Sequence, residues 1–416
     1  MAEQLSADAL YLMHLMSCAL RDAVPQALPA GAAWDGVYLL ALNNSVATTC
    51  AFAAAKAPDI ESAEAKRWRD EVYKNAVRHA VFADEREAIF TAMDEAGLAH
   101  LSLKGVVTAA AYPHPEMRWM CDNDFLFGRD LGDGNVRPAD DADSRALRRI
   151  MESRGYEVEE FERSNHDAYQ KAPFLNFEPH RALADDTLSW RGYFDKAWLR
   201  ACRTQDAAGL AYEFSREDAY IFHLAHLSKH YSSRGSGVRG IADQWALQRA
   251  WGRNMDRPYL DAELAKLADL GLVDVEPEIR RLAASVIDRD ACGQVLAGNT
   301  DALAPEDAAI IAYMLGSGTY GTFENYTRNR VRADAASEGL AGARVHYLLR
   351  RLFPPTKTLS DYYPVLKRAP WLRPAVDLYR FTVRPFQKRK RVGAELAAVM
   401  GKGGKESPAA PAVREE

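Results

Sequence analysis

The chain has 416 residues, of which 48% are hydrophobic and 27% are charged, and its formal net charge is −5. These values fit an ordinary soluble globular protein of two or three domains, and they exclude the global basic field that draws a protein to nucleic acid. The five cysteines are scattered, odd in number and without metal-ligand spacing, which indicates a reduced, cytoplasmic compartment. The early acids exclude a signal peptide, and the alanine-rich run at 46–55 is too short to cross a membrane.

Residues 1–98 are predicted to form an N-terminal helical region. Ser6 can cap a first helix, whose apolar positions recur at the helical period. A second helix begins near Trp34. A long amphipathic helix follows and ends at Gly97, because glycine readily takes the left-handed conformation that closes a helix.

Residues 99–200 are predicted to form a small α/β core, because nearly all strand signals of the chain fall within 99–183. Helices are expected at 106–111 and 144–154, and a loop rich in Gly, Asp and Pro is expected at 131–143. Short strands are expected at 101–103, 119–127, 156–161, 168–171 and 174–177. The predicted fold class is therefore α+β and mostly helical.

After residue 200 the helical period returns, and the next helix is expected to span 194–203 across this boundary. We expect a helical domain at 201–330, a C-terminal helical extension at 331–392 and a disordered tail at 393–416. The basic run at 388–391 is either a solvated helix end or a surface that touches acidic lipid or a polyanionic acceptor.

Three carboxylates are the candidate catalytic and metal-binding residues. Asp122 and Asp124 open an apolar run, and side chains two apart in a strand share a face. Glu178 follows another apolar run, unlike the solvated acids at 157–160, so a neighbouring strand can bring it alongside. Such carboxylates repel one another unless a cation neutralises them, and magnesium prefers oxygen ligands completed by substrate phosphates. An isolated Asp-x-Asp is usually a solvated strand end, but the combination with Glu178 favours a metal site.

Several cations are candidates for binding a nucleotide. Lys104 precedes Gly105, where the backbone can approach a phosphate closely, although Lys104 can also pack against the acids. Arg118 either binds the nucleotide as well or forms a structural ion pair with one of the acids. On a later helix, His226, Lys229 and His230 share one face and can bind phosphate, as an alternative to helix packing or acceptor binding. Protonated histidines there would raise nucleotide affinity as pH falls through about 6.5.

The order of these motifs resembles a bacterial family of uncharacterised nucleotidyltransferases in the DNA polymerase beta-like superfamily. The likeness begins at Leu103-Lys104-Gly105, Tyr112-Pro113, Arg118 and Asp122-Asn123-Asp124. It continues through Gly155-Tyr156, Glu178, His180, the helix with His226, Lys229 and His230, and Arg239 and Asp243. Together the motifs cover about residues 30–385, and their order and spacing are more specific than any one of them.

The resemblance implies a small mixed sheet with helices that carries metal-binding acids on adjacent strands. It implies transfer of a nucleoside monophosphate from a nucleoside triphosphate, such as ATP, to a hydroxyl-bearing small molecule, saccharide or protein. Two magnesium ions, or manganese in their place, would be held by Asp122, Asp124 and Glu178. The family identifies neither the acceptor nor the oligomeric state.

Two departures from the family pattern keep other functions open. Asn123 stands where an apolar residue is usual, so it must face a helix layer and be hydrogen-bonded or partly exposed. Pro179 forfeits a ladder hydrogen bond, so Glu178 is expected on an edge strand or at a strand end. The alternatives are a catalytically weakened nucleotide-binding or partner subunit, and a helical interaction protein whose acids are incidental.

Overall fold

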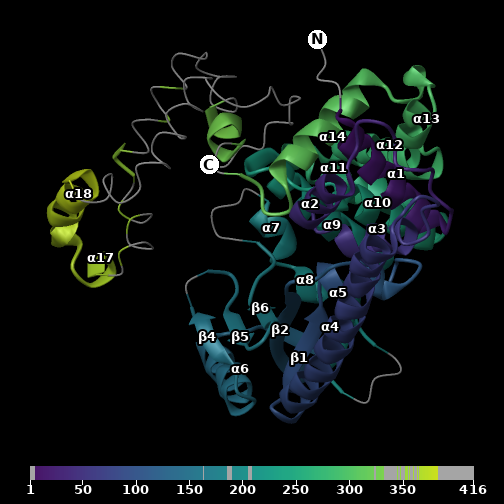
Figure 1. Cartoon of the computed structure of the whole chain (residues 1–416). Helices are drawn as coiled ribbons and strands as arrows, with labels where there is room; N and C mark the ends of the chain where they lie inside the picture. The colour runs from purple at the N-terminus through teal and green to yellow at the C-terminus, as the bar shows by residue number, and fades with distance from the viewer. Residues whose placement is uncertain are drawn as a thin grey trace.

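In the computed structural model, a lobe built around a β-sheet lies beside a larger helical lobe, and the long helix α4 (Ser62–Glu95) runs along the sheet (Figure 1). The structure describes residues 5–162, 164–184, 190–204, 209–322, 325–331 and 365–382, with a few isolated positions between 344 and 363. The predicted tail at 393–416, the basic run at 388–391 and most of the predicted extension at 331–392 lie outside the described residues.

The N-terminal helices follow their sequence signals. The Ser6 hydroxyl accepts a hydrogen bond from Ala9 N at 3.2 Å and caps α1 (Ala7–Arg21). Two short helices follow, α2 (Trp34–Asn43) and α3 (Ala47–Ala54). Helix α4 ends before Gly97, whose φ of 68° confirms the predicted left-handed stop.

Eight strands form one mixed sheet in the order β4-β5-β6-β2-β1-β8-β7, with β3 paired to β2. The pairs β2–β6 and β1–β8 are parallel, and the other neighbours are antiparallel. This confirms the α+β class with helical flanks. The strands are β1 (Leu98–Ser102), β2 (Asn123–Gly132), β3 (Asn135–Pro138), β4 (Glu157–Glu160), β5 (Ala168–Lys171), β6 (Leu175–His180), β7 (Ala201–Arg203) and β8 (Ala211–Phe214).

At two places in this lobe the structure has strands that the sequence did not predict. The expected loop at 131–143 contains a β2–β3 hairpin, in which Gly132, Asp133 and Gly134 all have positive φ. An Asp-Gly pair is a hairpin signal, and here it outweighs the polar composition. The expected helix at 194–203 is instead interrupted, and strands β7 and β8 follow as one edge of the sheet.

The two faces of β2 are covered differently. Phe125 and Phe127 point into a core made with α4 and α6 (Asp141–Ser153), whereas Leu126 packs in the larger core of the helical lobe. Asn123 shares the first face and its Oδ1 accepts a hydrogen bond from Arg86 of α4 at 3.0 Å, as predicted. Alternation along the strand therefore puts Asp124 on the opposite face, toward the helical lobe.

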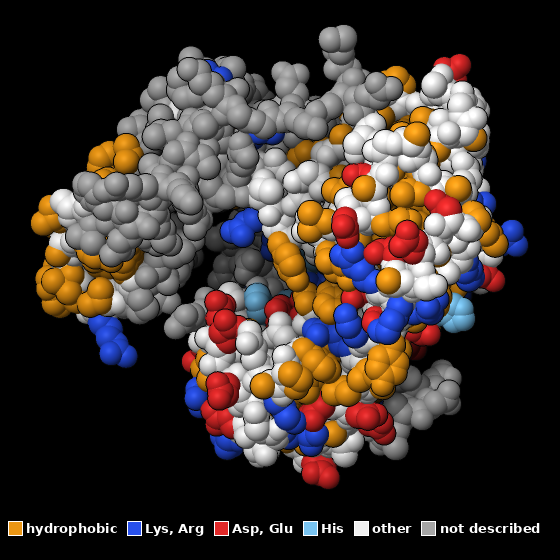
Figure 2. Space-filling model, in the orientation of Figure 1, with side chains coloured by type: hydrophobic (Ala, Val, Ile, Leu, Met, Phe, Trp, Pro, Cys, Tyr) orange, Lys and Arg blue, Asp and Glu red, His pale blue; other side chains and the backbone are white. Residues whose placement is uncertain are grey.

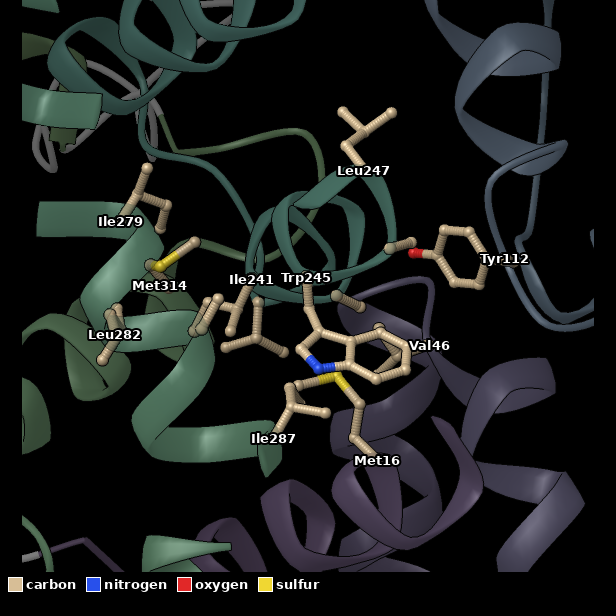
Figure 3. Close-up of a cluster of buried hydrophobic side chains, with 14 of the residues drawn as sticks. Met16, Val46, Tyr112, Ile241, Trp245, Leu247, Ile279, Leu282, Ile287 and Met314 are labelled. Carbon is tan, nitrogen blue, oxygen red and sulfur yellow. The ribbon is translucent and has the colours of Figure 1, made fainter. Parts of the chain in front are cut away.

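The helical lobe encloses α1 within later helices, and Figure 3 shows Met16 of α1 beside Trp245 and Ile287. Two helices of four residues lie between β6 and β7 in the chain, α7 (Arg191–Phe194) and α8 (Ala197–Arg200). The longer ones are α9 (Arg216–Ser233), α10 (Arg239–Trp251), α11 (Arg257–Ala265), α12 (Leu272–Ala283), α13 (Ala291–Leu296) and α14 (Pro305–Ser317). None of the described helices combines the length and the apolar character needed to cross a bilayer.

Candidate active site

Two neighbouring parallel strands bring the predicted acids together. In the register of β2 and β6, Asp124 is the direct partner of Glu178, which confirms that a neighbouring strand lies alongside. Strand β6 is neither an edge strand nor ended at Glu178, because it lies between β5 and β2 and continues to His180. The expectation drawn from Pro179 is therefore wrong. The Pro179 carbonyl accepts from Asp167 N at 3.0 Å, and only the proline's missing N–H interrupts the ladder toward β5.

Asp124 is the most enclosed of the three acids. Its Oδ1 lies 3.3 Å from Lys104 Nζ and 3.0 Å from His180 Nε2. Its Oδ2 is buried and has no hydrogen-bond partner among the described residues. Burial alone would raise the pKa of Asp124, but the neighbouring Lys104 charge and the His180 hydrogen bond hold it below its usual range. Asp124 is therefore a permanent carboxylate with one oxygen still unbonded.

The surroundings of Glu178 shift its pKa in the opposite direction from that of Asp124. Its Oε1 accepts from Asn176 Nδ2 at 3.3 Å, and its Oε2 lies 3.8 Å from His166 Nε2. Burial and the negative charges of Asp124 and Asp122 raise the pKa of Glu178 to about 7. The group therefore exchanges its proton near neutral pH.

Asp122 lies just before β2 rather than within the predicted strand at 119–127. Burial and repulsion from Asp124 raise the pKa of Asp122, while Lys104 and Arg239 act in the opposite direction. The described group of mutually close ligand atoms consists of Asp124, Glu178 and His180, within 4.8 Å of one another, and does not include Asp122. Asp122 is thus close enough to interact electrostatically with the other acids, but it lies outside the group of mutually close ligand atoms, at the rim of the cluster.

The chemistry of these donors fits a divalent metal ion. A hard cation such as magnesium or manganese takes carboxylate oxygens, and the buried Oδ2 of Asp124, which has no hydrogen-bond partner among the described residues, is an oxygen of this kind. His180 is less suited to be a ligand, because its Nδ1 lies 3.5 Å from the Asn165 amide and its Nε2 is bonded to Asp124. His180 therefore orients Asp124 through a hydrogen bond.

Lys104 links the acids to a group of cations. It opens α5 (Lys104–Ala109), so the helix starts two residues before the predicted 106–111. Its Nζ contacts Asp124 and donates to His226 Nε2 at 3.1 Å. Burial disfavours the charge of Lys104, but Asp124, Asp122 and Glu178 outweigh burial and raise the lysine pKa. The alternative in which Lys104 packs against the acids is therefore the arrangement observed.

Gly105 follows in the first turn of α5. A Cβ placed there would meet the Met120 sulfur at 3.5 Å and Arg118 Nη1 at 3.8 Å, which are ordinary contacts. The packing of the protein therefore does not require a glycine at this position. Close approach of a ligand to the backbone stays a prediction for Gly105.

Of the two alternatives expected for Arg118, the structure shows the structural ion pair with an acid. Its Nε and Nη2 donate to the two oxygens of Asp243 at 2.7 and 3.0 Å, and its Nη1 donates to Gly105 O at 3.4 Å. Tyr112 also donates to Asp243 at 2.7 Å, and the arginine is only 6% exposed. A buried, two-pronged ion pair of this kind fixes α10 against the Lys104–Gly105 corner.

The predicted face of His226, Lys229 and His230 lies on α9, with His226 against Lys104. His226 Nε2 also lies 3.0 Å from His230 Nε2, so the two rings share at most one proton between these nitrogens. Burial and the charge of Lys104 hold the pKa of His226 well below its ordinary value, and they lower that of His230 to about 4. Both rings are neutral between pH 6 and 8, so the expected rise in affinity through protonated histidines is not supported.

The permanent charge around these histidines comes from four other side chains. Lys104, Lys229, Arg234 and Arg239 all act on His230. Arg239 lies 3.9 Å from Asp243 and donates to Trp119 O at 3.2 Å. Arg234 escaped the sequence analysis because it follows α9 and has no helical-face relation to the histidines. His180 also escaped the residue assignment, although its place two residues after Glu178 on one strand face is a usable signal.

A second cluster of possible ligand atoms, formed by His14, Cys18 and Asp290, lies in the helical lobe. Both ring nitrogens of His14 are already bonded, because Nε2 accepts from Gln26 N at 2.9 Å and Nδ1 donates to Asp290 Oδ2 at 2.8 Å. Asp290 also caps α13 through Gly293 N. The cluster is therefore a structural tie between α1 and α13.

The sequence of the chain was compared with known proteins. A family model described as an uncharacterised nucleotidyltransferase matches residues 30–272. That range contains every acid and cation described above around Lys104. Searches of the curated proteins and of the solved structures found no match.

Proposed function

The chain belongs to this uncharacterised nucleotidyltransferase family, and from that premise we propose that it moves a nucleoside monophosphate from a nucleoside triphosphate to an acceptor hydroxyl. One observation carries the proposal. Lys104 Nζ touches both Asp124, at 3.3 Å, and His226, at 3.1 Å, so an acid cluster and a cation cluster meet at one lysine. A metal–triphosphate complex binds where both kinds of group lie side by side, because carboxylates coordinate the metal and cations bind the phosphates.

Asp124 and Glu178, with Asp122 at the rim, are the residues that would hold magnesium, as two ions in our proposal, or manganese in its place. Bound there, the metal would neutralise the triphosphate and lower the pKa of the acceptor hydroxyl. His180 and Lys104 hold Asp124 in one orientation from two sides. The side chain therefore needs little reorganisation to present its free Oδ2.

The acceptor oxygen forms a bond to the α-phosphorus, and the bond from that phosphorus to the bridging oxygen of pyrophosphate breaks. We assign removal of the acceptor proton to Glu178, because it is a carboxylate base that lies directly beside Asp124 in the register of β2 and β6. The nearby His166 Nε2, at 3.8 Å, lies where it can stabilise the ionised form.

The phosphates lie, in this proposal, between Lys104 and the end of α9. Permanent cations carry this role, with Lys229, Arg234 and Arg239 around the neutral pair His226 and His230. Neutral imidazoles still supply hydrogen bonds to phosphate oxygens without needing a proton from solution. We also propose a cytoplasmic location, since all five cysteines are free.

The alternative of a weakened or partner subunit was motivated by Asn123 and Pro179. Asn123 is bonded to Arg86 on the far face of β2, and Pro179 leaves the strand intact through His180. Neither residue displaces an acid, so these departures do not favour loss of activity. The alternative is tested by the same experiment as the proposal.

The experiment is incubation of the full chain with magnesium and each α-labelled nucleoside triphosphate, ATP first. Pyrophosphate release or label on an acceptor or on the chain itself is the expected result, absent in Asp124→Asn. Tight nucleotide binding without pyrophosphate release, with every acceptor class tried, assigns the chain to the binding-subunit alternative. Absence of both nucleotide and metal binding contradicts both functions.

A further inference from the structure

Most large apolar side chains of the C-terminal helical segment are exposed, and Leu366, at 2% exposure, is the buried one among those described. It comprises α17 (Val365–Arg368), the 3-10 turn Pro370–Leu372 and α18 (Arg373–Thr382), and none of the described residues of α18 is buried. The most exposed large side chains on it are apolar: Trp371 at 75% and Leu378 at 64%, with Val365, Leu372, Tyr379 and Phe381 between 37% and 46%. Hydrophobic side chains gather over α17 and α18 in Figure 2, with basic side chains at their edge.

The charged residues of α18 face the preceding part of the chain, on the side opposite to the exposed apolar residues. Arg373 donates to Pro354 O at 2.9 Å and to the Thr356 hydroxyl, so it faces the chain that precedes the helix. Asp377 bridges Arg373 and Arg380, and the Arg380 side chain is only 9% exposed. A helix in water normally does the reverse, with its charges outward and its apolar stripe covered. The outer face of α18 is therefore built for a partner that is itself apolar.

The charge of this segment indicates that the apolar partner also carries negative charge. Residues 365–392 contain nine Lys and Arg and one acid, Asp377, in a chain whose formal net charge is −5. Positive charge is thus concentrated in the stretch of sequence that carries the exposed apolar face, although five of these nine residues, Arg384 and the run at 388–391, follow α18 outside the described residues. Trp371 and Tyr379 add aromatic rings with a polar edge, which are enriched at the boundary between headgroups and acyl chains.

We propose that α17 and α18 dock the protein on the surface of an anionic lipid bilayer. The apolar side chains enter the boundary of the acyl region, and the basic residues of the sequence 365–392 other than Arg373 and Arg380, which pair with Asp377, meet lipid phosphates. A second copy of the chain fits less well, because a self-pairing face would bring two strongly basic segments together. A nucleic acid fits less well because it would leave Trp371, Leu378 and Phe381 in water.

The test is sedimentation of the full chain with vesicles of phosphatidylcholine and phosphatidylglycerol, and with vesicles of phosphatidylcholine alone. Binding to the anionic vesicles is expected, weakened by salt and more than about tenfold by combining Trp371→Ser, Leu378→Ser and Phe381→Ser. The matched control combines Val24→Ser, Leu131→Ser and Leu199→Ser, which removes equally exposed apolar side chains elsewhere and should leave binding unchanged. Neither triple variant should shift the melting temperature, since none of these side chains is buried.

Failure of the parent protein to bind anionic vesicles overturns the proposal, as does unaltered binding of the α18 triple variant. Equal loss in the control triple also overturns it. Analytical ultracentrifugation tests the remaining possibility, that α18 mediates self-association of the chain. An oligomer that the α18 substitutions dissolve, without vesicle binding, assigns the face to a second copy and overturns the bilayer proposal.

Discussion

The acid side and the cation side of the site are built by different parts of the fold. The acids stand on β2 and β6, where strand register fixes Asp124 opposite Glu178. The cations come from α9, from the segment after it and from α10, and Lys104 contacts both groups. A sheet register is local and rigid, whereas the cation side depends on how two lobes pack. Substitutions on the acid side should therefore abolish chemistry, and those on the cation side should weaken binding.

Asp124→Asn should have the largest effect. Transfer should fall about a thousandfold or more, because the carboxylate proposed to bind metal is lost. The free energy of unfolding should also fall by about 3 kcal/mol, because Lys104 loses its buried counter-ion. Turnover and urea denaturation measure the two effects. Asp133→Asn, at the exposed hairpin turn, is the control and should change neither, and wild-type turnover of Asp124→Asn would remove the metal assignment.

Asp122→Asn should separate activity from stability. Transfer should fall strongly, but the metal-free melting temperature should hold or rise, because repulsion from Asp124 is relieved. The sequence alone predicts this stability gain for both aspartates, and the Lys104 contact restricts it to Asp122. Differential scanning calorimetry of the two variants without metal is the measurement. A similar destabilisation of both would contradict the asymmetry between them.

Lys104→Met should affect both sides of the site. Nucleotide affinity, measured by calorimetry, should fall about tenfold because a phosphate cation is lost. The free energy of unfolding should fall by about 2 kcal/mol, since the side chain is only 20% exposed and pairs with Asp124. Lys56→Met, which removes an exposed pair with Asp22, should do neither.

His230→Gln should produce the smallest and most selective change. With its pKa lowered to about 4, His230 stays neutral in the fold but takes up a proton when unfolded below about pH 6.5. Its contribution to stability is therefore complete above about pH 6.5 and declines as pH falls toward 4. Glu178, with its raised pKa, acts with the opposite sign in part of this range, so the difference between variant and parent is measured. The parent should lose more stability than His230→Gln between pH 6.5 and 5, and parallel curves would contradict the assignment.

Part of this site could be predicted from the sequence. The Asp-x-Asp pattern and Glu178 after an apolar run identify the acids, because strand alternation is a local rule. The α9 helix face was also predictable, since it needs only helical periodicity. The pairing of Arg118 with Asp243, 125 residues away, was not, and neither was the neutrality of His226, which depends on burial beside Lys104. Strands β7 and β8 were not predicted, because strands of three and four residues carry almost no periodic signal.

The tie between His14 and Asp290 has a consequence for synthesis of the chain. The two residues are 276 positions apart, and the helix between Ala9 and Leu20 is buried almost completely. At about 5–20 residues per second, a ribosome needs roughly 14 to 55 seconds to make the partner of this helix after the helix itself. Throughout that interval α2 and α3 can already pack against α1, but the face of α1 that contacts α13 and residues 284–288 has no native cover. This helix is thus among the last to be fully enclosed, and a nascent chain of this protein presents a ready binding site to chaperones.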